Sequence, residues 1–477
     1  MRHLVLGLVM ALLLAGSAIS AGPSANAFIT NSGVTDVSVL DTATNGLSAV
    51  SIGASTHGVA MDPKGTRVYV AGATGSPSSV YAIDAKSKAV VGSATFATAV
   101  RSPFGVAVSP DGTRLFVTHG VKFGIRATQG ALSMLTISST GALSFDATLL
   151  LGGATTGVAV SPSGTRVYVA NTSQRISVID PAQIGVAGAN PVIATIFAVG
   201  SVFVGVAIAP DGTRLYAADY GNGRLLGITV AGIAADAVVD CAAPAAPLVA
   251  CVNVGSGPFG VAVSPNGKRV VVANSGSHDV TMIDAALVGA TPVTTSVGDG
   301  PHGVAVTSDS TKVYVINRFS NTLSVLNATS GALLSTVNLP NLSSPVGFGT
   351  FLTPIQMIKV CIHIVPGAIN LKKQGTVPVI LYSSDGQKPE CPAFDVHSAD
   401  LASIHLNGWA LEMKGNGEPM ASFGDYNGDG LEDVMVHIRV DASAQASAAQ
   451  SDSMATLEGQ TTDGLSFEGS ETVKFLH

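Results

Sequence analysis

The chain has 477 residues, of which 47% are apolar and only 12% are charged, against about 25% charged residues in an average soluble domain. Its 24 Lys and Arg against 31 Asp and Glu give a net charge of −7, which excludes the basic footprint of a nucleic-acid-binding protein. The high apolar content excludes a disordered chain, and the 54 glycines favour an all-β protein with many turns.

The first 27 residues have the pattern of a secretory signal peptide. Arg2 and His3 precede an apolar stretch over residues 4–14, and Ala25-Asn26-Ala27 is an A-x-A cleavage site. The alternative is a transmembrane anchor, which needs about 20 apolar residues and is therefore longer than this stretch. We expect cleavage near Ala27 and a mature protein that is secreted, periplasmic or on the cell surface, with no transmembrane segment.

One phrase recurs along most of the chain and carries the main structural signal. Its six complete copies begin at Gly58, Gly105, Gly157, Gly205, Gly260 and Gly303, and a degenerate copy surrounds Gly347. Gly-Val-Ala and a fourth apolar residue indicate a buried strand, the Ser-Pro-Asp-Gly type of sequence indicates a turn, and Arg-Val-Tyr-Val-Ala alternates as a half-buried strand does. Two further strands complete each unit, and such a unit repeated every 43–55 residues predicts the blades of a β-propeller.

The two ends of the repeat region complete one blade between them. Residues 28–31 match the second strand of a unit and residues 37–41 match the third, whereas the copy near Gly347 supplies only a first strand. Pairing these ends closes the ring and removes exposed strand edges. The sequence therefore predicts a seven-bladed β-propeller over residues 28–355, followed by a small β-sandwich over residues 356–477.

The phrases at residues 168–171, 271–274 and 28–31 resemble the YVTN-type β-propeller repeat family, and so does the Ser-Pro-Asp-Gly-Thr-Arg turn. The resemblance covers about residues 28–355. It implies an exported bacterial or archaeal protein whose fold relatives include seven-bladed lactonases and quinoprotein-like dehydrogenases. The Ala-rich insertion near residues 231–250 departs from the pattern of the family. The C-terminal segment resembles accessory modules of bacterial secreted proteins.

The four cysteines favour disulfides, because an even number in an exported chain usually pairs. The local pairings are Cys241–Cys251 in the Ala-rich insertion and Cys361–Cys391 in the C-terminal domain. Free buried thiols remain the alternative. The C-x-x-C spacing of a zinc site does not occur.

The segment from Asp425 to Asp433 has the spacing of a calcium loop. Oxygen-bearing side chains stand at loop positions 1, 3, 5 and 9, Gly430 permits a sharp turn, and position 7 offers a carbonyl; the candidate ligands are Asp425, Asn427, Asp429, Leu431 and Asp433. Position 12 is Val436 rather than Glu, so the loop resembles those of dockerin-type and FG-GAP-type modules more than an EF-hand. We expect a structural calcium ion, and the alternative is a turn rich in Asp and Asn.

His57 and His302 occupy the same position of the repeat, directly before its first glycine. The other complete copies place Phe104, Thr156, Val204 and Phe259 there. If the Gly-Val-Ala strand is innermost, this position faces the mouth of the central channel. The blades that carry the two histidines are then separated by one blade of the ring. His57, Phe104, Phe259 and His302 are therefore candidate ligand-binding residues, and the two histidines are weak candidates for catalysis. The alternative is that they only add polarity to the surface.

A second repeated position, at the start of the second strand, carries a cation in each complete copy: Arg67, Arg114, Arg166, Arg214, Arg269 and Lys312. A basic ring for anions is one interpretation. We favour the other, in which each cation contacts a carboxylate or a turn carbonyl of its own blade.

Two hypotheses for function follow. The first is a monomeric, non-enzymatic exported propeller that binds a protein, cell-surface or polysaccharide partner and carries a calcium-loaded accessory sandwich. The alternative is a lactonase-like or lyase-like enzyme that uses a metal at the channel mouth, with His57 or His302 among its ligands. No G-x-S-x-G or H-E-x-x-H motif supports another hydrolase class.

Overall fold

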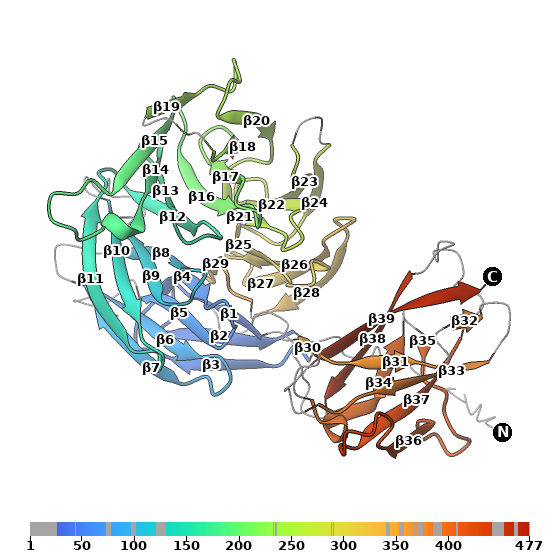
Figure 1. Cartoon of the computed structure of the whole chain (residues 1–477). Helices are drawn as coiled ribbons and strands as arrows, with labels where there is room; N and C mark the ends of the chain where they lie inside the picture. The colour runs from blue at the N-terminus through green and yellow to red at the C-terminus, as the bar shows by residue number, and fades with distance from the viewer. Residues whose placement is uncertain are drawn as a thin grey trace, which may run out of the picture. The chain divides into compact units, whose positions relative to one another are not determined.

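The structure is a computed structural model and is almost entirely β. It describes residues 26–476 except 43, 73–77, 97–101, 121–129, 232, 234–235, 288, 290, 340–343, 353–356, 366–367, 371–374, 385–393, 407–408, 441–452 and 462–465. The chain divides into two compact units at residues 356 and 357 (Figure 1). Within the described ranges, no helix is long and apolar enough to cross a membrane.

The first unit is a seven-bladed β-propeller, as the sequence predicts. The first strands of its six continuous blades are β4 (Thr56–Met61), β8 (Pro103–Val108), β12 (Thr155–Val160), β16 (Phe203–Ile208), β21 (Pro258–Val263) and β25 (Pro301–Val306). The second strands are β1 (Asn26–Ile29), β5 (Arg67–Gly72), β9 (Arg114–His119), β13 (Val167–Asn171), β17 (Arg214–Asp219), β22 (Arg269–Asn274) and β26 (Lys312–Asn317).

The third strands are β2 (Asp36–Asp41), β6 (Ser79–Asp84), β10 (Ala131–Ile137), β14 (Arg175–Ile179), β18 (Arg224–Thr229), β23 (Asp279–Asp284) and β27 (Thr322–Asn327). The fourth strands are β3 (Leu47–Ser51), β7 (Val90–Thr95), β11 (Leu143–Leu150), β15 (Val192–Ala198), β20 (Leu248–Asn253), β24 (Val293–Ser296) and β28 (Leu333–Asn338). A short 3-10 helix, η1 (Pro181–Gln183), follows β14. Successive strands of a blade pair antiparallel, and their alternating apolar residues are buried between blades.

The composite blade is built from both ends of the unit. β1 pairs with β2 and β3, and its other edge meets residues 345–352 through bridges from Asn31 to Pro345 and from Ala27 to Leu352. The amide of Phe28 donates to the carbonyl of Phe351 at 2.8 Å. β29 (Phe348–Gly349) then runs parallel to β4 of the first continuous blade. The ends of the propeller are therefore joined by hydrogen bonds, which leaves no first-strand edge open at this junction.

Steric crowding at the centre of the ring explains the glycine that begins each repeat. A Cβ placed on Gly58 would lie 2.0 Å from the carbonyl oxygen of Phe104 in the next blade, and one on Gly260 would lie 2.3 Å from that of His302. Adjacent first strands approach too closely for any side chain at these positions. The repeat glycine thus sets the radius of the ring.

The start of β1 bears on the expected cleavage site. Residues 1–25 lie outside the described residues, but Ala27 is fully buried within β1 and pairs with Leu40. Cleavage directly after Ala27 would convert the buried Phe28 amide into a charged ammonium group at a position that bonds to a carbonyl. Cleavage before Asn26 leaves the strand intact.

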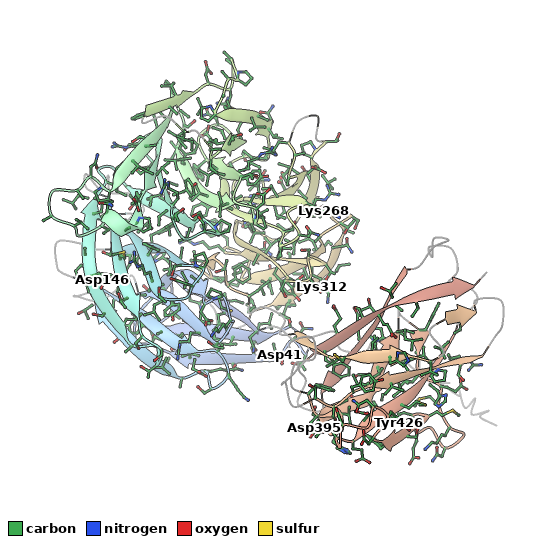
Figure 2. All side chains as sticks on the ribbon, viewed as in Figure 1. Asp41, Asp146, Lys268, Lys312, Asp395 and Tyr426 are labelled. Atoms are coloured by element: carbon green, nitrogen blue, oxygen red, sulfur yellow. A yellow bond between two sulfur atoms is a disulfide. The ribbon has the colours of Figure 1, made fainter. Side chains whose placement is uncertain are left out.

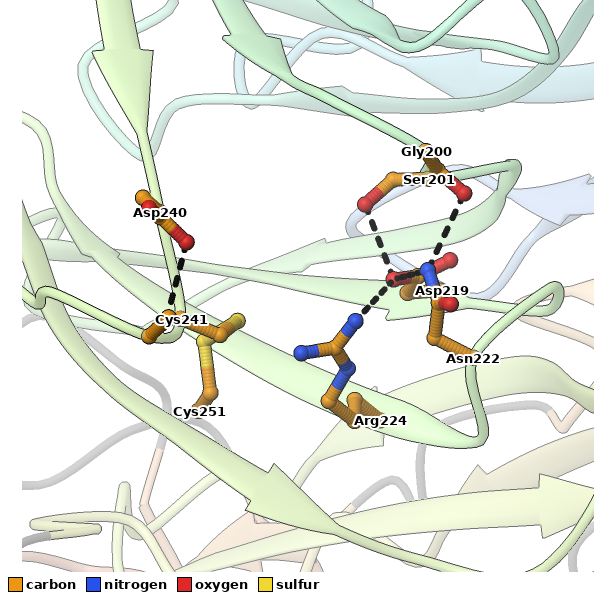
Figure 3. Close-up of a disulfide and its surroundings, with 9 residues drawn as sticks. Gly200, Ser201, Asp219, Asn222, Arg224, Asp240, Cys241 and Cys251 are labelled. Carbon is orange, nitrogen blue, oxygen red and sulfur yellow. Dashed lines mark hydrogen bonds and ion pairs between the residues drawn. A yellow bond between two sulfur atoms is a disulfide. The ribbon is translucent and has the colours of Figure 1, made fainter.

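A polar residue at or just after the end of the second strand forms hydrogen bonds that stabilise the turn after it. In the composite blade and the sixth blade, buried Asn31 and Asn317 donate from Nδ2 to groups of the following turn or third strand. The fourth blade has Asp219 at this position, also fully buried. Its carboxylate accepts from the Ser201 hydroxyl at 2.8 Å and the Asn222 amide at 2.7 Å (Figure 3).

The repeated arginines contact the next blade, so the prediction of contacts within their own blades is wrong for most of them. Arg67 donates to the carbonyl of Ser139 at 2.7 Å, and Arg214 donates to that of Ala285 at 2.6 Å. Arg114 and Arg269 make corresponding bonds across their own interfaces. Among these four the guanidinium is long enough to reach past the edge of its sheet, so it connects neighbouring blades instead of capping a local turn.

The Ala-rich insertion adds a strand to a neighbouring blade. β19 (Asp236–Val239) lies between β18 and β20 of the fourth blade, but it pairs in parallel with β15, the outer strand of the third blade. The predicted Cys241–Cys251 disulfide is present and links the end of this excursion to β20 (Figure 3). The insertion thus covers an exposed sheet edge and is fastened covalently to its own blade.

The second unit is a two-sheet β-sandwich, again as predicted. One sheet contains β30 (Met357–Lys359), β39 (Ser466–Leu476), β38 (Ser453–Thr461), β34 (Ala399–Leu406) and β35 (Trp409–Ala410), and β32 (Ala368–Asn370) also pairs with β39. The other contains β31 (Ile362–Ile364), β33 (Thr376–Leu381), β37 (Asp433–Arg439) and β36 (Ala421–Gly424), and η2 (Val396–Ser398) precedes β34. Buried residues of both sheets, such as Leu381, Val436 and Leu457, form one core.

Candidate functional site

The residues that precede the repeat glycines converge at one end of the propeller channel. Phe104, Val204, Phe259 and Val346 form a single buried apolar cluster, although they come from the second, fourth, fifth and composite blades. Residues from such distant blades can touch only across the central axis, so they close the channel. The cavity behind them has a volume of about 30 Å³, lined by first-strand residues such as Gly157 and Val206, which is room for about one water molecule. A substrate would have to bind on the outer side of this closure, which we call the channel mouth.

The two histidines of the repeat position belong to the channel mouth. His302 is 3% exposed and stacks on Phe259, with ring centroids 4.1 Å apart and an angle of 16° between the planes. His57 is partly exposed, and its ring centroid lies 5.6 Å from that of Phe104. The Nδ1 atom of each histidine is buried and has no hydrogen-bond partner among the described residues. Such buried polar atoms are uncommon and often mark sites of ligand binding or catalysis.

An arginine that the sequence analysis missed lies beside both histidines. Arg318 follows Asn317 at the end of β26, and its guanidinium lies 5.5 Å from the ring centroid of Phe319 and 3.5 Å from the hydroxyl of Ser32. Phe319 is 59% exposed and its ring makes an edge contact with His302. A sequence signal existed, since this is the one copy in which the residue after the second strand is basic.

Burial and this positive charge keep both histidines neutral. Burial, followed by the Arg318 charge, lowers the pKa of His57 from 6.5 to about 4. Burial, then Arg318 and His57, lowers the pKa of His302 to about 3. At neutral pH the channel mouth therefore holds two uncharged imidazoles beside one guanidinium. Neutral imidazoles can accept a proton, whereas the guanidinium can donate hydrogen bonds to an oxygen that gains negative charge.

Hydrogen bonds between blades hold the histidine backbone in place. The Thr30 hydroxyl in the composite blade donates to the carbonyl of His57 at 2.5 Å and accepts from the amide of Gly347 at 2.8 Å. Thr118 makes the same pair of contacts, to Thr156 and Gly105, two blades further on. In these two blades, a threonine near the end of the second strand therefore fixes the backbone of the channel-mouth residue in the next blade.

A third buried histidine in the propeller was also not singled out from the sequence. His119 ends β9, and its Nε2 lies 2.9 Å from the hydroxyl of Ser133. Its ring packs edge-on against Phe96 at 4.6 Å. Because these partners belong to the interior of the first two blades, His119 serves packing and lies apart from the channel mouth.

The residues of the predicted calcium loop lie in the sandwich, between β36 and β37. The Asp425 carboxylate accepts from the amides of Gly428 and Gly430 at 2.7 and 3.0 Å. Asp433 is buried, and its oxygens accept from the amides of Ser383 and Tyr426 at 3.0 Å each. Several of the expected ligand oxygens therefore hold the backbone of the loop. Calcium binding stays a prediction.

The described residues test the predicted Cys361–Cys391 disulfide and the predicted metal at the channel mouth only in part. Cys361 is disulfide-bonded, and its expected partner Cys391 lies outside the described residues. Within the described ranges, no group of three or more His, Cys, Asp or Glu side chains is placed to hold a metal ion. The two channel-mouth histidines therefore lack a third protein ligand of these types in the part of the chain that the structure describes, and we derive no step through a metal.

Comparison with known proteins shows that the fold is similar to that of several solved structures. No protein-family model and no curated protein matches the sequence. Among solved structures, the periplasmic gluconolactonase of Pseudomonas aeruginosa is similar with a TM-score of 0.54 and 16% identity over 68% of this chain and 97% of that chain. A putative 6-phosphogluconolactonase from Bacteroides fragilis has a TM-score of 0.53 and 13% identity over 70% and 98%. A protein from Lactobacillus plantarum has a TM-score of 0.54 and 17% identity over 68% and 98%.

These neighbours contradict the prediction of a non-enzymatic binding scaffold and favour the lactonase-like alternative. At these identities the similarity establishes the fold, and the activity of this chain remains a proposal. In the sequence, the two histidines of the repeat position have no evident polar partner. The structure supplies one in Arg318, which a loop brings to the same mouth.

Proposed function

We propose that the chain is a lactonase-like hydrolase that opens a cyclic ester at the channel mouth. The observation that carries this proposal is the meeting of His57, His302 and Arg318 at the closed end of the channel, where burial keeps both imidazoles neutral. The similarity of the fold to a gluconolactonase and a putative 6-phosphogluconolactonase supports the same reaction class.

In the proposed reaction, His57 acts as the general base because it is the more exposed of the two histidines and is uncharged at neutral pH. A water molecule gives its proton to His57 while its oxygen bonds to the carbonyl carbon of the lactone. Arg318 donates hydrogen bonds to the carbonyl oxygen as it becomes negative. The ring C–O bond then breaks, and the proton returns from His57 to the leaving alkoxide, which yields a hydroxy acid.

His302 serves as a positioning residue in this scheme. It is more deeply buried than His57, and it stacks on Phe259 while Phe319 meets its edge. Its uncharged ring adds no second positive charge to compete with Arg318. We therefore expect it to shape the floor on which the lactone rests.

The test is hydrolysis of a panel of lactones by the purified full chain. The reaction is monitored in a pH-stat through the protons that it releases. The panel contains glucono-δ-lactone, 6-phosphoglucono-δ-lactone and two aliphatic γ-lactones. Arg318→Met and His57→Gln should each lower kcat/KM by about 100-fold or more. Arg439→Met, at a side chain in the sandwich that is 74% exposed, is the matched control and should keep full activity.

The pH profile offers an independent check of the same proposal. Because the pKa of His57 is about 4, the base is unprotonated at neutral pH and activity should fall only as the pH drops through about 4. No hydrolysis of any lactone in the panel, or equal activity in the Arg318→Met and Arg439→Met variants, would overturn the proposal.

We also propose that the protein is an exported member of the YVTN-type family. The repeat phrases and the Cys241–Cys251 disulfide support this, since structural disulfides persist in oxidising compartments. Because Ala27 is buried in β1, we place the cleavage site before Asn26. Mass spectrometry of the exported protein tests this: a mature chain that begins at Phe28 would contradict it.

A further inference from the structure

The exposed large apolar side chains of the sandwich are concentrated in one short stretch. All those recorded for the described part of this unit lie within residues 413–431: Met413, Met420, Phe423, Tyr426 and Leu431, which are 36–45% exposed. Phe423 belongs to β36, which is the edge strand of its sheet. A contiguous exposed apolar region on a small domain commonly marks a binding surface.

Two aromatic rings form the centre of this surface. Phe423 is 43% exposed and stacks on His397, with centroids 5.1 Å apart and an angle of 10° between the planes. The ring of Tyr426 lies over Gly424, and its hydroxyl is 2.8 Å from that of Ser422. β36 and the turn after it therefore present flat rings at the edge of the sheet, and hydrogen bonds fix one of them.

A cavity opens directly beside the stacked pair. It has a volume of about 530 Å³, within the range of small-molecule sites, and it is lined by Ser383, Ser384, Phe394, Asp395, His397, Leu431 and Glu432. His397 belongs to both features, because it lines the cavity and stacks on Phe423. Figure 2 labels Asp395 and Tyr426 at the same end of the sandwich.

Polar side chains of Asp395, His397 and Glu432 line the cavity. The carboxylate of Glu432 lies 2.9 Å from Nε2 of His397, and both side chains are about half exposed. Asp395 accepts from the amide of His397, and a carboxylate has further lone pairs that can accept hydrogen bonds. The surface thus combines exposed aromatic faces with two carboxylates whose lone pairs can accept hydrogen bonds from hydroxyl groups.

We propose that this surface, which we call the Phe423 surface, binds a neutral saccharide. A pyranose ring has C–H groups on its faces and hydroxyls around its rim, so it can stack on Phe423 while its hydroxyls bond to Glu432, Asp395 and His397. Asp395 and Glu432 give the cavity a negative charge, which opposes an anionic polysaccharide. This inference is independent of the proposed lactonase activity, since it concerns the other unit.

The experiment is native affinity electrophoresis of the full chain in gels that contain one polysaccharide each. Five neutral probes (laminarin, xyloglucan, galactomannan, arabinoxylan and starch) are compared with the anionic polymer alginate. At least one neutral probe should retard the protein, and alginate should not. Phe423→Ala should raise the dissociation constant for the retarding probe by about tenfold or more.

Phe145→Ala is the matched control, because Phe145 is also about half exposed but lies on β11 of the propeller. It should leave the retardation unchanged. If Phe423→Ala does not fold, Tyr426→Ala and Glu432→Gln take its place, and thermal unfolding confirms their structure. Absence of retardation by all five neutral probes, or equal retardation of the variants and the native chain, would overturn the proposal. So would a concentration-dependent dimer that Phe423→Ala abolishes, which would identify the surface as an interface between copies.

Discussion

The propeller buries some of its histidines deeply, whereas the described histidines of the sandwich all keep some exposure to solvent. In the propeller, His119 and His302 are 1% and 3% exposed and lie among aromatic rings and hydroxyls. In the sandwich, three of the four described histidines each lie 2.9 Å from a glutamate, in the pairs His363–Glu471, His397–Glu432 and His405–Glu458. The propeller also has one surface pair of this kind, His278–Asp299 at 2.7 Å, so what distinguishes it from the sandwich is the deep burial of His119 and His302.

The difference follows from how each unit uses its strand ends. In the ring, the next blade covers the end of the second strand of each blade. A histidine at the end of such a strand is therefore buried. In the sandwich, the strand edges and the connections face solvent, and a polar residue there meets other surface side chains. We therefore expect side chains with shifted pKa values in the propeller. In the sandwich we expect recognition of ligands through exposed side chains.

The largest expected effect separates the central crowding of the ring from the open surface of the sandwich. Gly58→Ala would place a methyl group 2.0 Å from a backbone oxygen of the next blade, whereas Gly415→Ala in the sandwich meets nothing within 4 Å. We expect Gly58→Ala to lower the free energy of unfolding of the propeller by about 3 kcal/mol or more. Gly415→Ala should change that of the sandwich by less than about 0.5 kcal/mol. Urea unfolding measures both, and equal midpoints for Gly58→Ala and the native chain would contradict the close approach of the blades.

Acid should weaken the propeller through its buried histidines. Burial lowers the pKa of His119 and of His302 from 6.5 to about 3. Below pH 6.5 the unfolded chain binds protons that the folded propeller excludes, so stability that is complete above pH 6.5 declines as the pH falls towards 3. Burial also lowers the pKa of His57, to about 4, so at pH 5 the expected loss is about 2 kcal/mol for each of these three residues.

Urea unfolding at pH 7.5 and pH 5.0 tests this expectation. His119→Gln should remove about a third of the pH dependence of the propeller midpoint, because glutamine does not titrate and His57 and His302 remain. A propeller midpoint that is the same at both pH values would show that these histidines are not excluded from protonation in the folded state.

The ring was predictable from the sequence because each blade repeats its own local instructions. The glycine and the alternating second strand recur in every complete copy, and a turn with Pro and Gly of the Ser-Pro-Asp-Gly type recurs in five of the six, so the copies confirm one another. The split ends at Phe28 and Gly347 could be matched to the missing strands for the same reason. The repeated position also pointed to His57 and His302, since a shared place in the repeat implies a shared height along the channel.

What lies outside the repeat was harder to predict. Arg318 stands in a turn, and only the closed ring brings that turn beside His57 in another blade. The reach of Arg67 and Arg214 to the next blade depends on the spacing between sheets, which no single copy encodes. The stacking of Phe423 on His397 joins residues from separate elements of a unit without repeats, so no periodicity could reveal it.

The disulfide should contribute a smaller stabilisation that is confined to the propeller. Cys241 and Cys251 close a loop with a sequence separation of 10 residues, which corresponds to about 2–3 kcal/mol in the chain-entropy account. The double variant Cys241→Ser with Cys251→Ser should lower the propeller transition and leave the sandwich transition in place. Calorimetry of the full chain measures both transitions. A shift of the sandwich transition alone would contradict this assignment.

The smallest expected effect is that of calcium on the sandwich. If Asp425, Asn427 and Asp429 hold the ion expected from their spacing, it binds only the folded loop, so chelation should lower the sandwich transition by a few degrees and leave the propeller transition unchanged. Asp429→Ala should abolish the effect of the chelator. Asp395→Ala, at an acidic residue of the same unit outside the loop, should preserve it. The hydrogen bonds of Asp425 to the amides of Gly428 and Gly430 already order the loop, which keeps the expected shift small. A sandwich transition that is the same with EDTA and with added calcium would show that these bonds, rather than a metal, account for the Asp and Asn spacing.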